Sequence, residues 1–231
     1  ISGSSNDMIK KMAPIINRTP AALAYKLMNF TSLDSEKQKI GNKGKSAASS
    51  SDKEIWNEYF GNWEKLAFDS SIILSNIQNK PIEQFLDLET ELKYVEGKEK
   101  ERIVKTRVNQ NDFRQRILAS YNEQCCITGI SIKSLLVASH IIPWSKNAQE
   151  RLNPKNGICL NSIHDKAFDK GLITITTDFK VKLSDTILKK KKETNIQKYF
   201  IDYENQPIIL PERFIPSIEF LEYHHKNIFN Q

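Results

Sequence analysis

The chain has 231 residues, enough for one or two domains, and its composition excludes several classes of protein. Hydrophobic residues make up 39% and charged residues 27%, which is ordinary for a protein with a buried core. No apolar run reaches the ~18 residues that a membrane span requires. The polar start also lacks the apolar stretch of a signal peptide. We therefore expect neither a membrane partner nor secretion.

Cysteine content and net charge bear on the cellular compartment and on the class of partner. Cys125, Cys126 and Cys159 are too few for a disulfide framework and contain no CxxC pair for structural zinc, so we expect buried thiols in a reduced, cytoplasmic protein. The chain does not begin with methionine, which indicates that it starts inside a longer protein. Its formal charge of +6 permits a nucleic-acid partner but is too small to indicate one by itself.

Residues 6–30 have the pattern of two short helices joined by a tight turn. Thr19-Pro20 is typical of a helix start, because threonine caps well and proline suits the first helical position. Such a pair is consistent with a helix-turn-helix, whose second helix can enter the DNA major groove. A plain helical hairpin fits equally, and the pattern leaves both open. Arg18 and Lys26 are the outward-facing candidates for DNA contact.

The next stretch predicts a linker and a helix. Residues 41–53 are small and polar, as in flexible linkers. A helical pattern follows from residue 53 to about 78. Its aromatic residues Trp56, Tyr59 and Trp63 are interpreted as core rather than as a base-stacking platform.

An acidic connector follows Pro81 and ends near Gly97, where we place the domain boundary. This divides the chain into a helical, helix-turn-helix-like module over residues 1–96 and a second domain over residues 97–231. The first domain is the candidate DNA-binding module.

A basic amphipathic helix is expected at the start of the second domain. Residues 98–116 carry seven Lys and Arg against three Asp and Glu. Apolar side chains at helical spacing predict a helix from about residue 111 to 121. Arg107, Arg114 and Arg116 are candidate phosphate contacts, although a solvated charged face is an equally good interpretation. Lys189–Lys192 form a second basic run, interpreted as a loop.

Residues 125–175 contain the candidate catalytic residues. The pattern reads as strand, turn, strand, irregular loop, short strand and helix, followed by a further strand over residues 172–176. His140 ends the second strand, Asn156 precedes the third, and His164 lies in the first turn of the helix. The spacings are 16 residues from His140 to Asn156 and 8 residues from Asn156 to His164.

A His, a central Asn and a His on a ββα frame resemble the HNH endonucleases. The flanking stretches LLVASHIIPWS and ERLNPKNGICLNSIHDKAFDKGLITI are similar to the HNH domain of restriction endonucleases. The resemblance covers most of the chain and is most specific over residues 106–175. It implies an α+β protein, with a mainly helical N-terminal module and a ββα-metal nuclease domain.

The resemblance also implies catalytic roles. His140 corresponds to the general base, since a neutral imidazole accepts a proton from water near pH 7. Asn156 corresponds to the central Asn that braces the base-bearing loop through backbone hydrogen bonds. His164 corresponds to a ligand of a divalent metal ion, most often Mg²⁺ or Mn²⁺ in this family, which stabilises the charge on the phosphate.

The sequence departs from the common pattern beside the base. Many relatives have Asp or His there, whereas this chain has Ser139, a weak ligand. Asp165 and Asp169 are four residues apart, hence on one helical face beside the expected site. A one-residue shift of helix register would make Asp165 rather than His164 the ligand. Asp169 can instead cap the helix or pair with a neighbouring lysine.

Other candidate residues are less defined. Arg151 either clamps the scissile phosphate or forms a salt bridge. His224 and His225 are expected on a surface helix, and Trp144 is expected to pack.

Together these features predict a metal-dependent endonuclease acting on double-stranded DNA in restriction or defence. A single HNH site cuts one strand at a time, so a double-strand break requires a homodimer or two successive nicks. Two alternatives remain: a DNA-binding protein whose HNH frame has lost catalysis, which Ser139 favours, and a nuclease specific for structured DNA or for RNA.

Overall fold

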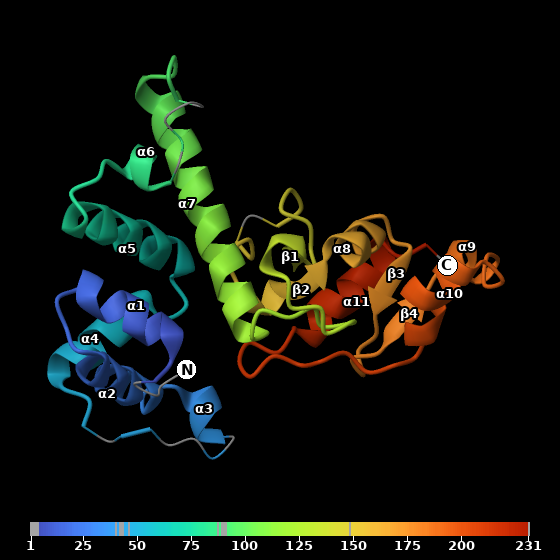
Figure 1. Ribbon diagram of the computed structural model, residues 1–231, viewed down its shortest axis with the longest axis horizontal. Coiled ribbons are helices and arrows are strands. Elements are labelled where there is room, and N and C mark those ends of the chain that lie inside the picture. Colours follow the sequence, from blue (N-terminus) through green and yellow to red (C-terminus); the bar gives the residue numbers. More distant parts are fainter. Residues whose placement is uncertain are drawn as a thin grey trace. The chain divides into compact units, whose positions relative to one another are not determined.

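The computed structural model describes residues 5–39, 41, 44–45, 47–86, 88, 92–147 and 149–230, without the side chain of Glu36. Its internal contacts divide the chain into two compact units, residues 1–110 and 111–231. Helices occur in both units, whereas the strands in the described part of the chain all lie in the second, as in the α+β protein predicted from the sequence (Figure 1).

Helices are the regular secondary structure of the described part of the first unit. In chain order it contains α1 (Asp7–Ile15), α2 (Pro20–Thr31), α3 (Ser35–Lys39), α4 (Ser50–Tyr59), α5 (Trp63–Ile77), α6 (Ile82–Phe85) and the beginning of α7 (Gly97–Ser120). The expected helical pair at the N-terminus is present, and the Thr19 hydroxyl caps α2 by accepting a hydrogen bond from the Ala22 amide at 3.2 Å. The loop between α1 and α2 is short, as either a helix-turn-helix or a hairpin requires.

Two features of the first unit differ from the sequence prediction. The single helix expected from residue 53 to 78 is broken between α4 and α5, where Gly61 has φ +85°. The acidic stretch after Pro81, expected as a connector, also contributes two leucines to the core. Leu88 and Leu92 are buried in one cluster with Ala67 of α5 and with Val104 and Val108 of α7. Burying these side chains fastens the segment to α5 and α7.

Helix α7 runs without interruption across the boundary between the units. It begins at Gly97, at the expected domain boundary, and ends at Ser120, so the predicted helix over residues 111–121 is its C-terminal half. The division by contacts falls later, at residues 110 and 111. The side chains predicted to form the apolar stripe are all buried in the second unit: Phe113, Ile117, Leu118 and Tyr121.

The second unit is built from two small antiparallel sheets with helices against them (Figure 1). Strand β1 (Leu136–His140) pairs with β2 (Gly157–Asn161), and α8 (Ser162–Asp169) follows β2 directly and contacts both strands. Strand β3 (Ile173–Ile175) pairs with β4 (Val181–Leu183). The remaining helices are α9 (Asp185–Leu188), α10 (Thr194–Tyr199) and α11 (Ile218–Asn227), with 3₁₀ turns η1 (Lys133–Leu135), η2 (Pro154–Asn156) and η3 (Ile201–Tyr203).

The β1–β2–α8 arrangement matches the predicted ββα order, with sharply defined helix ends. The Asn161 side chain caps α8 by accepting hydrogen bonds from the amides of Ile163 and His164, both at 3.0 Å. Gly171, at φ +66°, ends the helix in a conformation that glycine adopts without strain. The first strand expected after residue 125 is absent, because residues 126–128 form a turn and residues 125–132 contain no strand.

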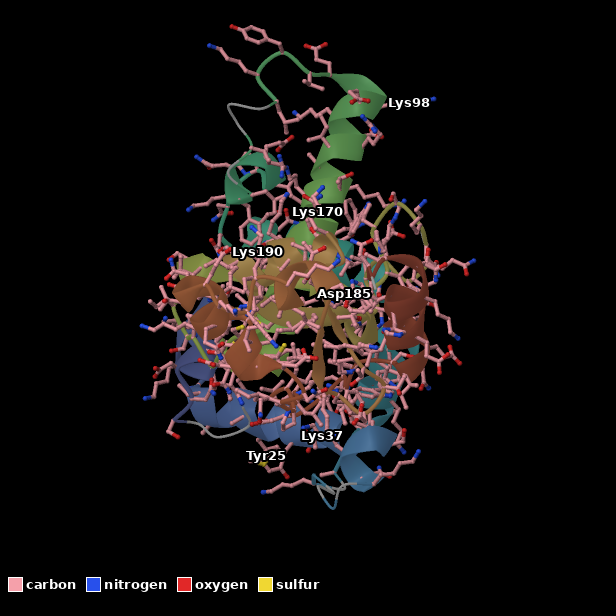
Figure 2. The ribbon with its side chains drawn as sticks, turned by 90° about the vertical axis from the view of Figure 1, so that its right-hand side faces the viewer. Tyr25, Lys37, Lys98, Lys170, Asp185 and Lys190 are labelled. Carbon is pink, nitrogen blue, oxygen red and sulfur yellow. The ribbon has the colours of Figure 1, made fainter. Side chains whose placement is uncertain are left out.

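Other sequence expectations concern the thiols, the lysine run and the membrane. Cys125, Cys126 and Cys159 are free and buried, which confirms them as buried thiols. Lys189–Lys192 form the exposed turn between α9 and α10, where Figure 2 labels Lys190. No helix in the described parts of the chain is long and apolar enough to cross a membrane.

His224 lies on the buried side of α11 rather than at the surface. Its side chain is 1% exposed, its ring stacks on Phe168 at a centroid distance of 3.6 Å, and Nδ1 is 2.8 Å from the Thr174 hydroxyl. Nε2 donates to the Phe168 carbonyl at 3.1 Å. Burial lowers the pKa of His224 from its ordinary 6.5 to about 4.

This buried histidine predicts acid sensitivity. The unfolded chain binds a proton near pH 6.5 and the folded chain only near pH 4, so stability is complete above pH 6.5 and falls as the pH drops toward 4. The difference corresponds to about 3 kcal/mol of unfolding free energy. Denaturant unfolding between pH 7 and 4 should show a shallower slope in His224→Gln than in the wild type and in His225→Gln, because other buried histidines such as His140 supply the rest of the slope. An unchanged slope in His224→Gln would assign the acid sensitivity elsewhere.

Candidate active site

His140 is the last residue of β1 and lies directly opposite Gly157 of β2. Its imidazole is held on three sides. Phe113 stacks on one face at a centroid distance of 3.9 Å and an interplanar angle of 10°. Trp144 meets the ring edge-on at 5.4 Å. The third contact is polar, from Nε2 to the backbone carbonyl oxygen of Arg151 at 2.9 Å.

The polar contact fixes which ring nitrogen of His140 can accept a proton. A carbonyl oxygen only accepts hydrogen bonds, so Nε2 must carry the hydrogen and donate it to Arg151. In the neutral ring the lone pair then lies on Nδ1. The arrangement therefore presents one basic nitrogen and anchors the other.

The surroundings of His140 keep the ring uncharged near neutral pH. Burial lowers the pKa of His140 below its ordinary value, while the Arg151 carbonyl and the carboxylate of Asp169 act in the opposite direction. The Asp169 contribution also places that carboxylate within electrostatic reach of the imidazole. A neutral imidazole is the form that accepts a proton from water.

The Asn156 side chain bonds the backbone just after His140 and the backbone just before Arg151. This amide side chain is 1% exposed. Oδ1 accepts a hydrogen bond from the Ile142 amide at 2.8 Å, and Nδ2 donates to the carbonyls of Ile142 at 3.2 Å and Glu150 at 3.1 Å. Ile142 is two residues after His140. Glu150 directly precedes Arg151, whose carbonyl accepts the hydrogen bond from the His140 ring. One buried amide therefore connects the two segments that orient the imidazole.

Gly157 makes room for the ring stacked on His140. A Cβ at this position would lie 2.5 Å from Cδ1 of Ile117 and 2.7 Å from Cζ of Phe113. Both neighbours are buried, at 0% and 2% exposure, so neither side chain can move aside freely. Glycine therefore allows α7 to approach the strand pair directly opposite the base.

Gly157→Ala should lower the unfolding free energy by about 1–3 kcal/mol, because it overpacks this contact. Ile117→Val removes Cδ1, the atom nearest the new methyl group. The double variant should therefore lose less stability in denaturant unfolding than the sum of the two single variants. Strict additivity would show that the methyl group is accommodated without pressing on Ile117.

Ser139 precedes His140 in β1, and Asp165 and Asp169 lie on α8, which contacts that strand. Asp165 is half-buried, and burial raises its pKa, with the nearby Asp169 acting in the same direction. The Ser139 hydroxyl lowers the pKa of Asp165, which places the two side chains close together. That hydroxyl is buried and has no partner that meets hydrogen-bond geometry among the described residues, so we regard it as near the carboxylate but not bonded to it.

These oxygen ligands fit a hard divalent cation. Within the described ranges, no three His, Cys, Asp or Glu side chains are grouped closely enough to hold a metal ion. Mg²⁺ characteristically takes one or two carboxylates and completes its shell with water and substrate phosphate. Two neighbouring carboxylates with an unpartnered buried hydroxyl match that requirement, whereas a site formed by protein ligands alone is not supported.

One comparison with known proteins identifies the segment that contains this site. Residues 125–176 match the family model described as HNH endonuclease. The chain contains an HNH endonuclease domain. The matched segment spans β1, β2, α8 and β3 and includes His140, Asn156 and both carboxylates of α8. A search of curated proteins found no match to the chain. The HNH match indicates a nuclease that acts on DNA.

His164 of the HNH domain points away from the base. Its side chain is 1% exposed. Nδ1 lies against the Asn161 amide group at 2.9–3.1 Å, and Nε2 donates to the Tyr199 carbonyl at 2.8 Å. The ring packs edge-on against Phe200 and Tyr203. With both nitrogens engaged, His164 fastens α8 to the segment around α10, and Asp165 occupies the face toward Ser139.

The basic residues predicted to contact DNA lie in different environments. In the first unit, Arg18 is exposed and donates to its neighbour's carbonyl, and Lys26 pairs with the buried Asp52 at 2.9 Å. Arg107 is exposed on α7 and contacts Gln110.

The other three arginines lie in the second unit. Arg114 donates to the Lys133 carbonyl at 3.3 Å. Arg116 pairs with Asp112 and is largely buried, with 13% of its side chain exposed. Arg151 donates through Nε to the Trp144 carbonyl at 2.7 Å. Among these three, Arg151 is the one attached to the loop that holds the base.

Phe113, Trp144 and Gly157 were not predicted as parts of the site. Phe113 appears in sequence only as one position of an apolar stripe, and Trp144 only as packing after a proline. The single available signal was the spacing, since His140 pairs with Gly157 once the two strands are aligned. The contact with Phe113 on a separate helix required the tertiary structure.

Proposed function

We propose that the protein is a metal-dependent DNA endonuclease in which His140 is the general base. The observation that carries this proposal is the His140 imidazole, kept neutral by burial and with Nε2 anchored to Arg151 beside the carboxylates of α8. This arrangement supports acceptance of a proton from water at Nδ1. The attacking oxygen then forms the bond to phosphorus as the 3′ oxygen leaves with its electron pair.

The same site supports a bound divalent cation. Asp165 would hold it, with Asp169 and the Ser139 hydroxyl as further oxygen ligands directly or through water. Mg²⁺ or Mn²⁺ bound there supplies Lewis-acid stabilisation of the charge that develops on the phosphate. His164 is not assigned as a ligand, since both of its nitrogens are engaged elsewhere.

DNA binding is assigned to both units. In the first unit, the α1–α2 pair with the exposed Arg18 is the candidate contact with duplex DNA, and Lys26 contributes positive charge while it holds Asp52. In the second, Arg114 and Arg151 are the better candidates for phosphate contact, because Arg116 is largely buried in its pair with Asp112. A homodimer would allow two such sites to cut both strands.

We assign the biological role to restriction of foreign or modified DNA, on the resemblance of the flanking sequence to restriction endonucleases. Unmodified or differently modified plasmid should transform cells that produce the wild-type chain at least about tenfold less efficiently than cells that produce His140→Ala. Equal transformation by every DNA tested would contradict the restriction role while leaving the nuclease chemistry intact.

A second candidate function is a DNA-binding protein that has lost catalysis. Ser139 at a ligand position and the lack of a three-ligand cluster in the described residues favour it. Retention of a neutral, anchored His140 favours the nuclease, because a binding protein has no need of an oriented base.

A further inference from the structure

The loop between β1 and β2 contains a closed set of contacts centred on Trp144. Its indole meets His140 edge-on at 5.4 Å. Its backbone carbonyl accepts a hydrogen bond from Nε of Arg151 at 2.7 Å, and the Arg151 guanidinium lies 5.2 Å from the indole centroid. The circuit closes through the backbone, because the Arg151 carbonyl accepts the hydrogen bond from His140.

This circuit gives Trp144 two effects on one site. It limits where the His140 ring can lie, and it fixes the Arg151 side chain by a hydrogen bond and a cation–π contact. Arg151 hydrogen-bonds through Nε, and its Nη groups have no hydrogen-bond partner among the described residues. A guanidinium held at Nε can still offer both Nη groups to a phosphate.

We propose that Trp144 is a positioning residue that aligns the general base and a phosphate-binding guanidinium with one another. The inference rests on the proposed nuclease function. Trp144 itself touches neither the phosphate nor the attacking water. It acts by keeping Arg151 and His140 at a fixed separation, so that the phosphate bound by one faces Nδ1 of the other.

The test compares Trp144→Leu and Trp144→Phe with a control at an aromatic residue that does not contact His140. Phe229→Leu is the matched control, since Phe229 stacks on His225 of α11. With the whole chain and duplex DNA, Trp144→Leu should lower the single-turnover cleavage rate about 100-fold, as expected for a misplaced base. The DNA dissociation constant should rise less than about fivefold. Trp144→Phe keeps a ring edge near His140 and should cleave at least about ten times faster than Trp144→Leu.

A second readout does not depend on activity. Nitrogen-15 NMR of the histidine side chains should show His140 as the Nε2–H tautomer in the wild type and in Phe229→Leu. Trp144→Leu keeps the backbone carbonyl that accepts from Arg151 but loses the indole contacts with His140 and Arg151, which should give a mixture of both tautomers. If Trp144→Leu does not fold, Trp144→Phe carries the comparison, with a cleavage rate and a tautomer ratio between those of the control and those expected for Trp144→Leu.

The proposal stands only if both readouts change in Trp144→Leu and neither changes in Phe229→Leu. An unchanged His140 tautomer would overturn it, and so would a cleavage rate no lower than that of the control. If the wild type cuts no DNA, the proposed function fails and the role of Trp144 in cleavage fails with it. The tautomer measurement then decides separately whether Trp144 positions His140.

Discussion

His140→Ala should lower the rate of DNA cleavage about 100- to 10,000-fold, the usual contribution of a general base. The dissociation constant for the same DNA should change less than about threefold, because the base acts on water and does not hold the phosphate backbone. Single-turnover cleavage and equilibrium binding, measured on one duplex, separate the two effects.

His225→Ala is a matched control for this variant, since His225 lies on α11 outside the HNH match and stacks on Phe229. It should cut DNA at the wild-type rate. If His140→Ala lost binding as steeply as cleavage, His140 would be a structural residue and the assignment of the base would be wrong.

Asp165→Asn should lower cleavage in Mg²⁺ about 100- to 1,000-fold, since it removes a charged oxygen at the point where phosphate charge develops. The amide has nearly the same size as the carboxyl group, so the fold should be preserved. Raising the Mg²⁺ concentration should recover part of the rate, because the loss is mainly in metal affinity. Cleavage measured over a Mg²⁺ titration checks both statements.

His164→Gln is the comparison that decides between the two possible ligands. We expect it to lower the unfolding free energy, because it removes contacts to Asn161 and Tyr199, while the Mg²⁺ concentration at half-maximal cleavage stays unchanged. If instead the Mg²⁺ dependence shifted in His164→Gln and not in Asp165→Asn, the ligand assignment would be reversed.

The sequence predicted the elements that carry the site because their signals are local. A β-run ending in His140 became β1, and Asn161 and Gly171 mark the two ends of α8 by capping and by positive φ. The resemblance to HNH endonucleases implied the role of Asn156, and its side chain bonds the backbone of Ile142 and Glu150. The predictions of β1 and α8 depended on residue type and short spacing alone.

Helix register could not be predicted in the same way. Successive residues are rotated by about 100° around a helix, so a cap shifted by one position exchanges which side chain faces the strands. The sequence left His164 and Asp165 as alternatives for this reason. Packing of Phe200 and Tyr203 on His164 decides the orientation, and both lie more than thirty residues later in the chain.

Long-range packing explains the other differences. Gly61 looks tolerable inside a helical pattern, yet its positive φ separates α4 from α5. Leu88 and Leu92 stand in an acidic stretch that reads as a connector, and only their contact with α5 and α7 makes them core. The contacts of Phe113 and Trp144 with His140 could not be predicted from the sequence for the same reason.

The most direct test of the central claim is cleavage of supercoiled plasmid by the full chain and by His140→Ala, with Mg²⁺, Mn²⁺ or EDTA. The account predicts nicked or linear plasmid from the wild type with either metal. It predicts intact plasmid in EDTA and with His140→Ala. Cleavage that persists in EDTA, or that His140→Ala performs at the wild-type rate, would contradict a metal-dependent nuclease with His140 as its base.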